Sequence, residues 1–380
     1  MTRPIRALID TYALEKNLSL LRAKSGNRFL WGVVKANAYG HGLIGLLPTF
    51  DNWVDGLALL DPKEGVDIRK AGWAKAVLLI EGIFAASDIE MADEYGFETV
   101  IHNERQIEWL EKAELKNTLR VHLKCNTGMN RLGFRPEAIP QVLFRLNNIP
   151  KVEVVDLLAH FANAEVTYGQ DKPVTVQNQL SALTQLRGLL PMCLSNTGGI
   201  LWHEAGDEAV RAGIAMYGVS PDGNISSASL GIDPVMTLES EIIAFQDLQP
   251  GEACGYGSKF IAHRPTRLAV VACGYADGYP RLLHDHADML VCGKRARVVG
   301  RVCMDQLMLD VTDIPEAEVG MTDTIFGKDG ENTITVDELA SFNSTIHYEM
   351  VWLVGKRVPR IYLRHGEQVG QLNYICPEPF

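Results

Sequence analysis

The segment FLWGVVKANAYGHG, residues 29–42, places a lysine directly after an unbroken apolar run. Residues 29–34 are apolar at successive positions, which is typical of a parallel strand buried on both faces. Lys35 would stand at the carboxyl end of that strand, where barrel enzymes carry their active sites. A desolvated lysine has a lowered pKa and can form a Schiff base, so Lys35 is a candidate catalytic residue. The alternative is a lysine whose ammonium reaches solvent from the strand end.

Apolar runs like this one recur along the first 234 residues, with stretches of helical periodicity between them. Eight strands alternating with helices favour a closed parallel (β/α) barrel over an open sheet, so we predict an α/β fold of that kind. The predicted helices include residues 62–71, 104–113 and 175–189. The predicted strands are residues 29–34, 56–60, 76–80, 99–102, 120–124, 154–158, 192–195 and 209–215.

Residues 220–234 are polar and rich in turn-forming residues, which is typical of a linker. After this segment the pattern of apolar and polar residues changes. Beyond it, short strand-like runs dominate, and one short helix is predicted over residues 336–341. The strand-like runs cover residues 236–244, 267–273, 289–302 and 306–311. We therefore predict a (β/α)8 barrel over residues 7–234 and a mostly-β domain over residues 235–380, with residues 1–6 as a possible addition to the second domain.

Bulk properties narrow the class of protein. The formal net charge of −11 argues against nucleic-acid binding, which requires a basic patch. The first ten residues lack the apolar segment of a signal peptide, and no run of about 18 apolar residues predicts a membrane span. The seven cysteines are scattered without a Cys-x-x-Cys pair, which favours free thiols in the cytoplasm over disulfides or zinc. His284, Asp285 and His286 are adjacent and alternate sides, so we expect no metal site.

Polar residues follow several of the predicted barrel strands. Lys124 and Arg131 lie at the end of one strand and in the loop after it, where two cations favour an anion. His160 follows another strand, within LAHFA at residues 158–162. Thr197 lies in SNTGGI at residues 195–200, which could cradle a phosphate through backbone N–H groups or simply begin a helix with Thr197 as its N-cap. Each residue could also play a purely structural part.

Taken together, these strings resemble the motifs of the alanine racemase family over nearly the full chain. The matching segments are KANAYGHG (35–42), LKCNTGMNRLG (123–133), LAHFA (158–162), SNTGGI (195–200), VRAGIAMYG (210–218), EACGYGS (252–258), GYADGYPR (274–281), GRVCMDQ (300–306) and HYE (347–349). Three positions differ from the usual pattern: Asn126 stands where aspartate is common, Thr197 where serine is usual, and Ala212 where proline is frequent.

The resemblance implies a role for each matching residue. Lys35 and Tyr256 would be the two catalytic bases on opposite faces of the substrate, with Lys35 serving the D and Tyr256 the L enantiomer. Lys124 would be open to carbamylation. The implied cofactor-binding set, for pyridoxal 5'-phosphate, is Lys35, Tyr39, His160, Thr197, Arg211, Gly213, Ile214 and Tyr348. The implied substrate-binding set is Arg131, Tyr275, Met304 and Asp305.

The resemblance also implies a function: interconversion of L-alanine and D-alanine in a cytoplasmic homodimer whose sites take Tyr256 from the other subunit. The product would serve peptidoglycan synthesis or alanine catabolism. Three alternatives stay open from the sequence. A racemase of broader or serine specificity would differ only in pocket size. A decarboxylase of the same architecture would fit the Tyr256 motif poorly, and a non-enzymatic pyridoxal-phosphate carrier would lack the second domain.

Overall fold

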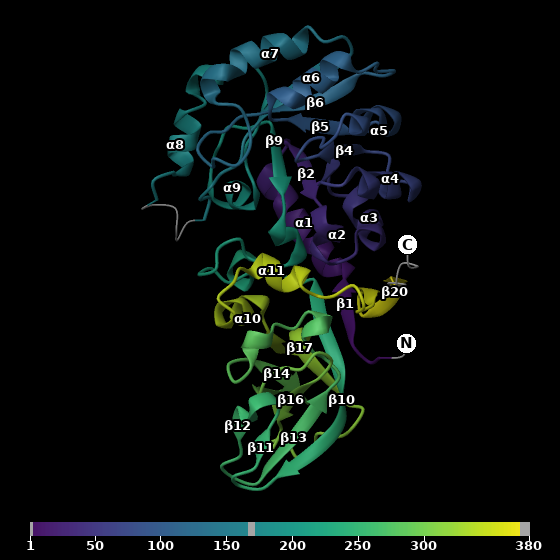
Figure 1. Ribbon diagram of the computed structural model, residues 1–380, viewed down its shortest axis with the longest axis vertical. Helices are drawn as coiled ribbons and strands as arrows, with labels where there is room; N and C mark the ends of the chain where they lie inside the picture. The colour runs from purple at the N-terminus through teal and green to yellow at the C-terminus, as the bar shows by residue number, and fades with distance from the viewer. Residues whose placement is uncertain (1–2, 166–171, 373–380) are drawn as a thin grey trace. The chain divides into compact units, whose positions relative to one another are not determined.

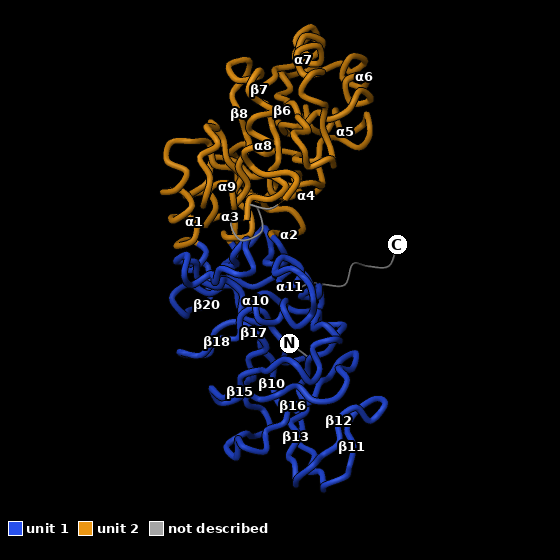
Figure 2. The backbone as a smooth tube through the Cα atoms, turned by 90° about the vertical axis from the view of Figure 1, so that its left-hand side faces the viewer, with its two compact units in different colours: residues 1–14, 39–45, 217–380 blue, residues 15–38, 46–216 orange. Residues whose placement is uncertain are grey.

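The computed structural model describes residues 3–165 and 172–372, and these form two compact units. One unit comprises residues 15–38 and 46–216, and we call it the barrel unit. The other comprises the described parts of residues 1–14, 39–45 and 217–380, and we call it the β unit (Figure 2). The β unit thus includes two short segments from the amino-terminal part of the chain, in addition to everything after residue 216.

The barrel unit is a closed barrel of parallel strands, which confirms the predicted fold (Figure 1). Each strand follows the one before it, and β2 closes the ring by pairing with β9 through Phe29–Ala209 and Trp31–Arg211. All eight predicted strands are present within a few residues of their expected ends. The strands are β2 (Phe29–Val33), β3 (Gly56–Leu59), β4 (Ala76–Leu79), β5 (Glu98–Ile101), β6 (Leu119–Lys124), β7 (Val152–Leu158), β8 (Met192–Cys193) and β9 (Ala209–Ala212).

The helices of the first 216 residues begin where the sequence supplies caps. Asp61 accepts the Lys63 N–H at the start of α4, and Asn103 accepts the Gln106 N–H at the start of α6. The helix predicted over residues 175–189 is shorter, because α8 ends at Ser181 and only a 3₁₀ turn follows. The helices are α1 (Thr11–Ser25), α2 (Lys35–Tyr39), α3 (Leu43–Asp51), α4 (Pro62–Lys70), α5 (Ser87–Tyr95), α6 (Glu104–Lys112), α7 (Ile139–Asn147), α8 (Val176–Ser181) and α9 (Thr197–Trp202).

The interior of the barrel contains a buried ionic layer that the sequence analysis did not anticipate. His122 on β6 contacts Glu98 Oε2 through Nε2 and Asp156 Oδ1 through Nδ1, each at 2.8 Å. Its ring meets the edge of Trp31 with centroids 5.8 Å apart. Because β2 and β6 are not neighbours in the barrel, this contact crosses its interior. Burial alone would lower the pKa of His122, but Asp156 and Glu98 outweigh it and raise the pKa to about 9.

The β unit is built on one large sheet, in the order β18-β17-β14-β15-β16-β13-β10-β1-β19-β20. An additional pairing of β17 with β10 closes the strands from β17 to β10 into a ring. The amino-terminal strand β1 (Arg6–Asp10) pairs antiparallel with β10 and parallel with β19. The other strands of the sheet are β10 (Met236–Leu248), β13 (Thr266–Val271), β14 (Asp288–Val291), β15 (Lys294–Val299), β16 (Leu307–Asp310), β17 (Thr322–Asp329), β18 (Asn332–Ile334), β19 (Arg360–Arg364) and β20 (Glu367–Leu372).

Smaller elements complete this unit, and one of its helices was not predicted. The strand-like run over residues 289–302 contains a hairpin of β14 and β15, in whose tight turn Cys292 and Gly293 both adopt positive φ. A second helix, α11 (His347–Trp352), follows α10 (Val336–Phe342), so His347 and Tyr348 lie on a helix and not on a strand. The short strands β11 (Ala253–Cys254) and β12 (Phe260–Ile261) pair separately. Among the described helices, none is long and apolar enough to cross a membrane.

Candidate active site

The chain after β2 forms a left-handed turn that begins at Lys35. Residues 36–39 all have φ between 51° and 56°, although none is glycine. A left-handed conformation costs an L-residue roughly 1–2 kcal/mol, so surrounding contacts must hold the turn. The Ala38 N–H donates to the Val34 carbonyl at 2.8 Å, and the Asn37 N–H donates to the Glu64 carboxylate at 3.1 Å. Backbone strain of this kind concentrates at functional sites.

Positive charge collects around Lys35 within the barrel unit. Burial lowers the pKa of Lys35, Glu81 raises it and Arg131 lowers it further. Burial also lowers the pKa of Lys124 to about 7, together with Arg211 and Arg131. Part of the Lys124 amine is therefore neutral near pH 7. Lys35, Lys124, Arg131 and Arg211 together outnumber the acids that act on the two lysines, Glu81 and Asp156, so the site is suited to an anionic ligand.

Arg211 on β9 is held rigidly by main-chain oxygens. One terminal nitrogen of its guanidinium donates to the Cys193 carbonyl at 2.7 Å, and the other donates to the Ala159 carbonyl at 2.7 Å and the Leu194 carbonyl at 3.1 Å. The residue is 2% exposed, and no carboxylate accepts from it among these contacts. A guanidinium does not lose its proton in proteins, so Arg211 is a fixed positive charge.

His160 lies beside Arg211 as a neutral imidazole. Burial lowers the pKa of His160, and Arg211, Lys124, Arg131 and Lys35 lower it further. Arg211 donates to its Nδ1 at 3.3 Å. The neutral half-buried ring offers a flat aromatic face for stacking.

Buried Gln179 on α8 is a supporting residue that the sequence analysis missed. Its amide donates to the Thr127 hydroxyl at 2.7 Å and to the His160 carbonyl at 2.9 Å, and its oxygen accepts from the Ala162 N–H at 2.8 Å. It therefore ties the loop after β6, which carries Arg131, to the loop after β7, which carries His160. A lone glutamine in a predicted helix carries no sequence signal for this role.

The residues expected to cradle a phosphate lie at α9 and after β9. Asn196, not Thr197, is the N-cap of α9, because its side chain accepts the Gly199 N–H at 3.0 Å. The alternative in which Thr197 is the N-cap of this helix is therefore wrong. Its hydroxyl instead accepts the Gly213 N–H at 2.9 Å, which joins the start of α9 to the segment containing Gly213 and Ile214.

Tyr39 and Tyr348 belong to an aromatic cluster in the β unit. The Tyr39 ring stacks on Tyr217 with centroids 4.8 Å apart and lies 6.3 Å from Tyr348. Burial raises the pKa of Tyr39, so its phenol stays protonated and can donate. The segment after Tyr39 is held closely: a side chain at Gly42, which has a φ of +92°, would overlap the Tyr362 hydroxyl.

The other predicted residues lie on loops of the β unit. Tyr256 begins a 3₁₀ turn and is 66% exposed, while Tyr275 and Met304 are 43% and 53% exposed. The Tyr275 N–H donates to the Cys303 carbonyl at 3.0 Å, so the loops that carry Tyr275 and Met304 lie together. All three side chains are therefore open to solvent in this chain.

Asp305 is anchored by a chain of charges. Arg357 donates to Asp305 Oδ1 and to Asp277 Oδ1, each at 2.7 Å, and Arg3 donates to the other Asp277 oxygen at 3.0 Å. Asp277 is fully buried beneath the Tyr275 loop. This network holds Asp305 on one side of Met304, and the Tyr275 N–H bond to the Cys303 carbonyl holds the other side.

The structure thus brings the predicted residues together in three groups. The barrel unit gathers Lys35, Lys124, Arg131, His160, Thr197, Arg211, Gly213 and Ile214. The β unit gathers Tyr39 with Tyr348, and separately Tyr275 with Met304 and Asp305, while Tyr256 lies on its own turn. Among the residues that the structure describes, no group of three or more His, Cys, Asp and Glu side chains is arranged to hold a metal ion.

Comparisons with known proteins agree with this architecture. Residues 9–221 match the alanine racemase N-terminal domain, and residues 235–362 match the alanine racemase C-terminal domain. An alanine racemase of Burkholderia mallei is 41% identical over 362 residues, which is 94% of this chain and 99% of that protein. A catabolic alanine racemase of Klebsiella aerogenes is 41% identical and covers 96% of this chain and all of its own length. The crystal structure of the biosynthetic alanine racemase from Pseudomonas aeruginosa is 37% identical, with a TM-score of 0.89 over 95% of this chain and all of that one.

Proposed function

We propose that this chain, which belongs to the alanine racemase family and is an amino-acid racemase, interconverts L-alanine and D-alanine with pyridoxal 5'-phosphate bound at Lys35. The observation that carries the proposal is the set of cations around a lysine of lowered pKa at the mouth of the barrel. An amine must be neutral to attack an aldehyde, and burial favours the neutral form of Lys35.

The residues at this mouth fit the cofactor. Its phosphate would meet the segment joined by Thr197 and Gly213. The resemblance adds the phenol of Tyr39 as a further phosphate donor, and burial keeps that phenol protonated by raising its pKa. The neutral His160 ring would stack on the pyridine ring. Arg211 would face the pyridine nitrogen, and the carbonyls that hold its guanidinium favour that fixed position.

The protein residues would then direct the chemistry. When bound, pyridoxal phosphate acidifies the α-proton of the amino acid and acts as an electron sink. Arg211 would temper this effect, because a guanidinium does not give up its proton and would leave the pyridine nitrogen unprotonated. Racemisation requires a proton to leave one face of the α-carbon and another to arrive on the opposite face. We assign the D enantiomer to the amine of Lys35 and the L enantiomer to the phenol of Tyr256.

Further residues would bind the substrate carboxylate. Arg131 supplies a positive charge at the mouth, and the backbone at Met304 supplies a position held by the Asp305–Arg357 contact. A carbamylated Lys124 would be an anion beside Arg131 and would hold that guanidinium in place. The lowered pKa supports this modification, because a neutral amine adds carbon dioxide. Asn126 does not oppose it, since its oxygen caps the local turn by accepting the Gly128 and Asn130 N–H groups, as an aspartate would.

We also propose a cytoplasmic homodimer in which Tyr256 acts at the barrel of the partner subunit. The exposure of Tyr256, Tyr275 and Met304 supports this, because aromatic residues and methionine are enriched in interfaces. The D-alanine would serve peptidoglycan synthesis, or the enzyme would serve alanine catabolism.

The direct test is to measure D-alanine formed from L-alanine by the purified protein loaded with pyridoxal phosphate, with L-serine run in parallel. The proposal predicts rapid formation of D-alanine and little D-serine. Faster formation of D-serine would support the alternative of serine specificity. Cofactor binding without inversion of either amino acid would contradict racemisation and direct attention to decarboxylation or carriage of the cofactor.

A further inference from the structure

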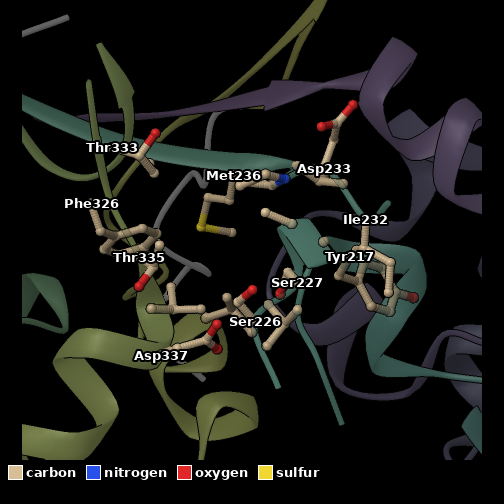
Figure 3. Close-up of a pocket in the computed structure, with 18 of the residues that line it drawn as sticks. Tyr217, Ser226, Ser227, Ile232, Asp233, Met236, Phe326, Thr333, Thr335 and Asp337 are labelled. Atoms are coloured by element: carbon tan, nitrogen blue, oxygen red, sulfur yellow. The ribbon is translucent and has the colours of Figure 1, made fainter. Parts of the chain in front are cut away.

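The β unit contains a cavity of about 460 Å³ that no part of the proposed mechanism uses. It lies between the segment of residues 217–236 and the region formed by β17, β18 and the start of α10 (Figure 3). A volume of this size lies in the range of small-molecule sites. Every lining residue belongs to the β unit, so the cavity is complete within it.

One side of the cavity is apolar. Met236, Phe326 and Ile232 line it and are each at most 3% exposed, and the Tyr217 ring forms a further part of this wall. The sulfur and methyl end of Met236 and the edge of the Phe326 ring point toward the centre of the view in Figure 3. These groups offer a surface for a compact apolar or aromatic body.

Other residues that line the cavity are polar, and one of them is an acid with an oxygen that lacks a hydrogen bond. Ser226, Ser227 and Thr335 contribute hydroxyls, and Asp337 lies beside them (Figure 3). Asp337 Oδ1 is buried and has no hydrogen-bond partner. A buried carboxylate oxygen without a donor costs free energy, which a cationic or donating ligand would recover.

The charged groups around Asp337 do not supply that donor. His347 Nδ1 is 3.5 Å from Asp337 Oδ1 and lies closer, at 3.2 Å, to the Ser220 carbonyl oxygen. The second acid of the cavity, Asp233, has Lys328 at 3.6 Å, and its carboxylate points away from the centre in Figure 3. Lys328 is half exposed and faces Asp233. Asp337, whose carboxylate lies beside the serine hydroxyls in Figure 3, is therefore the acid available to a ligand, with His347 as its ionic neighbour.

From this arrangement we propose that the cavity is a binding site for an organic cation, whose charged nitrogen contacts Asp337 and whose apolar body packs against Met236, Phe326 and Tyr217. The carboxylate supplies the charge complement, and the aromatic rings add a cation–π contribution. A carboxylate ligand of the same shape would be repelled. The site is distinct from the barrel mouth, where the charge is positive and selects anions.

A ligand here would touch the same tyrosine that supports Tyr39. Tyr217 lines the cavity and stacks on Tyr39 at 4.8 Å. On the other side, His347 next to Asp337 precedes Tyr348 in α11. Both tyrosines of the aromatic cluster are thus near neighbours of the cavity. Binding of the cation itself does not depend on the roles proposed for those tyrosines.

Benzyltrimethylammonium is a suitable probe for the holoenzyme. Its quaternary nitrogen cannot condense with an aldehyde, so it leaves the cofactor untouched, and its phenyl ring supplies the apolar body. Titration calorimetry should show saturable binding of this cation and none of benzenesulfonate, an anion with a similar ring. Binding should be unchanged by saturating L-alanine, whereas competition with L-alanine would place the probe at the active site and overturn the proposal.

Two variants test the location. Asp337→Asn keeps the side-chain shape and removes the charge, and it should weaken the affinity at least tenfold. Ser226→Trp fills the cavity from an exposed position and should abolish binding, with racemisation and the melting temperature close to those of the wild type. Wild-type affinity in either variant, or an absence of binding to the wild-type protein, would refute the cation site.

Discussion

The buried histidine inside the barrel predicts a pH dependence of stability that one substitution should remove. His122 titrates at about 9 in the fold, against an ordinary value of 6.5, because Asp156 and Glu98 hold its charged form. A folded pKa above the unfolded one stabilises the protein fully below pH 6.5, and this stabilisation disappears as the pH rises through 9. The difference in pKa corresponds to about 3 kcal/mol.

The comparison is between the wild-type protein and His122→Gln, which retains a polar side chain that carries no charge. At pH 6 the variant should be less stable by about 3–5 kcal/mol, the usual cost of leaving one side of a buried ionic contact unpaired. Near pH 10, where His122 is neutral, that difference should shrink by about 3 kcal/mol. The β unit is the same in both proteins, so its contribution to the free energy of unfolding cancels when the two values are subtracted.

Urea denaturation at a series of pH values between 6 and 10, followed by tryptophan fluorescence, measures this difference. NMR of labelled histidine in the folded protein gives the pKa of His122 directly. A constant gap between the two proteins across this range, or a His122 resonance that titrates near 6.5, would refute the reasoning.

Three other outcomes follow from the same structure. Burial, with Glu239 and Glu241 nearby, raises the pKa of Asp323 to about 8, so its proton is retained in the fold and stability falls between pH 4 and pH 8. Asp323→Asn should abolish this fall of about 6 kcal/mol in the free energy of unfolding. An unchanged profile of stability against pH would contradict this expectation. If Lys124 acts as a carbamylated anion, Lys124→Glu should retain at least tenfold more racemase activity than Lys124→Met. Intact-mass measurement of the wild-type protein should show one added carbon dioxide. Equal activities of the two variants would argue against an anionic role. Arg360 donates to four main-chain carbonyls, those of Gly40, Gly355, Val358 and Val354. Arg360→Lys should reduce the free energy of unfolding by about 2–4 kcal/mol, because acceptors are left unpaired, and should lower the melting temperature. A wild-type melting temperature would show that these bonds contribute little.

The barrel was predictable because its signals are local. Each strand is a short apolar run, and the capped helices between them begin at Asp61, Asn103 and similar residues. The sequence analysis gave residues 289–302 as a strand-like run without locating its turn, because Cys292 and Gly293 form that turn and cysteine is not a residue typical of positive φ. The same limits apply to α8, whose helical pattern continues in sequence beyond Ser181 although the helix ends there.

The site was predictable in its residue types and not in its shape. Lys35 was recognisable from its place after an apolar strand, but the left-handed turn from Ala36 to Tyr39 was not, since alanine prefers the right-handed region. That turn is held by a distant acceptor, Glu64. Tertiary contacts of this kind leave no periodic trace in the sequence.

The layer around His122 shows the same limit most clearly. Its three members come from β5, β6 and β7, and each alone is an ordinary polar residue in a strand. Only the pairing of β6 with β5 and β7 brings Glu98 and Asp156 each within 2.8 Å of His122. Gln179 likewise acquires its role only when the loops after β6 and β7 meet.

The central claim is that two bases on opposite faces exchange the α-proton, Lys35 for the D and Tyr256 for the L enantiomer. The most direct test measures, by NMR in deuterium oxide, the exchange of the α-hydrogen of each enantiomer with cofactor-loaded Tyr256→Phe. The account predicts that the variant retains the cofactor, still exchanges D-alanine, and loses exchange of L-alanine and racemisation by at least about 100-fold. Racemisation at the wild-type rate, or equal loss of exchange from both enantiomers, would contradict it.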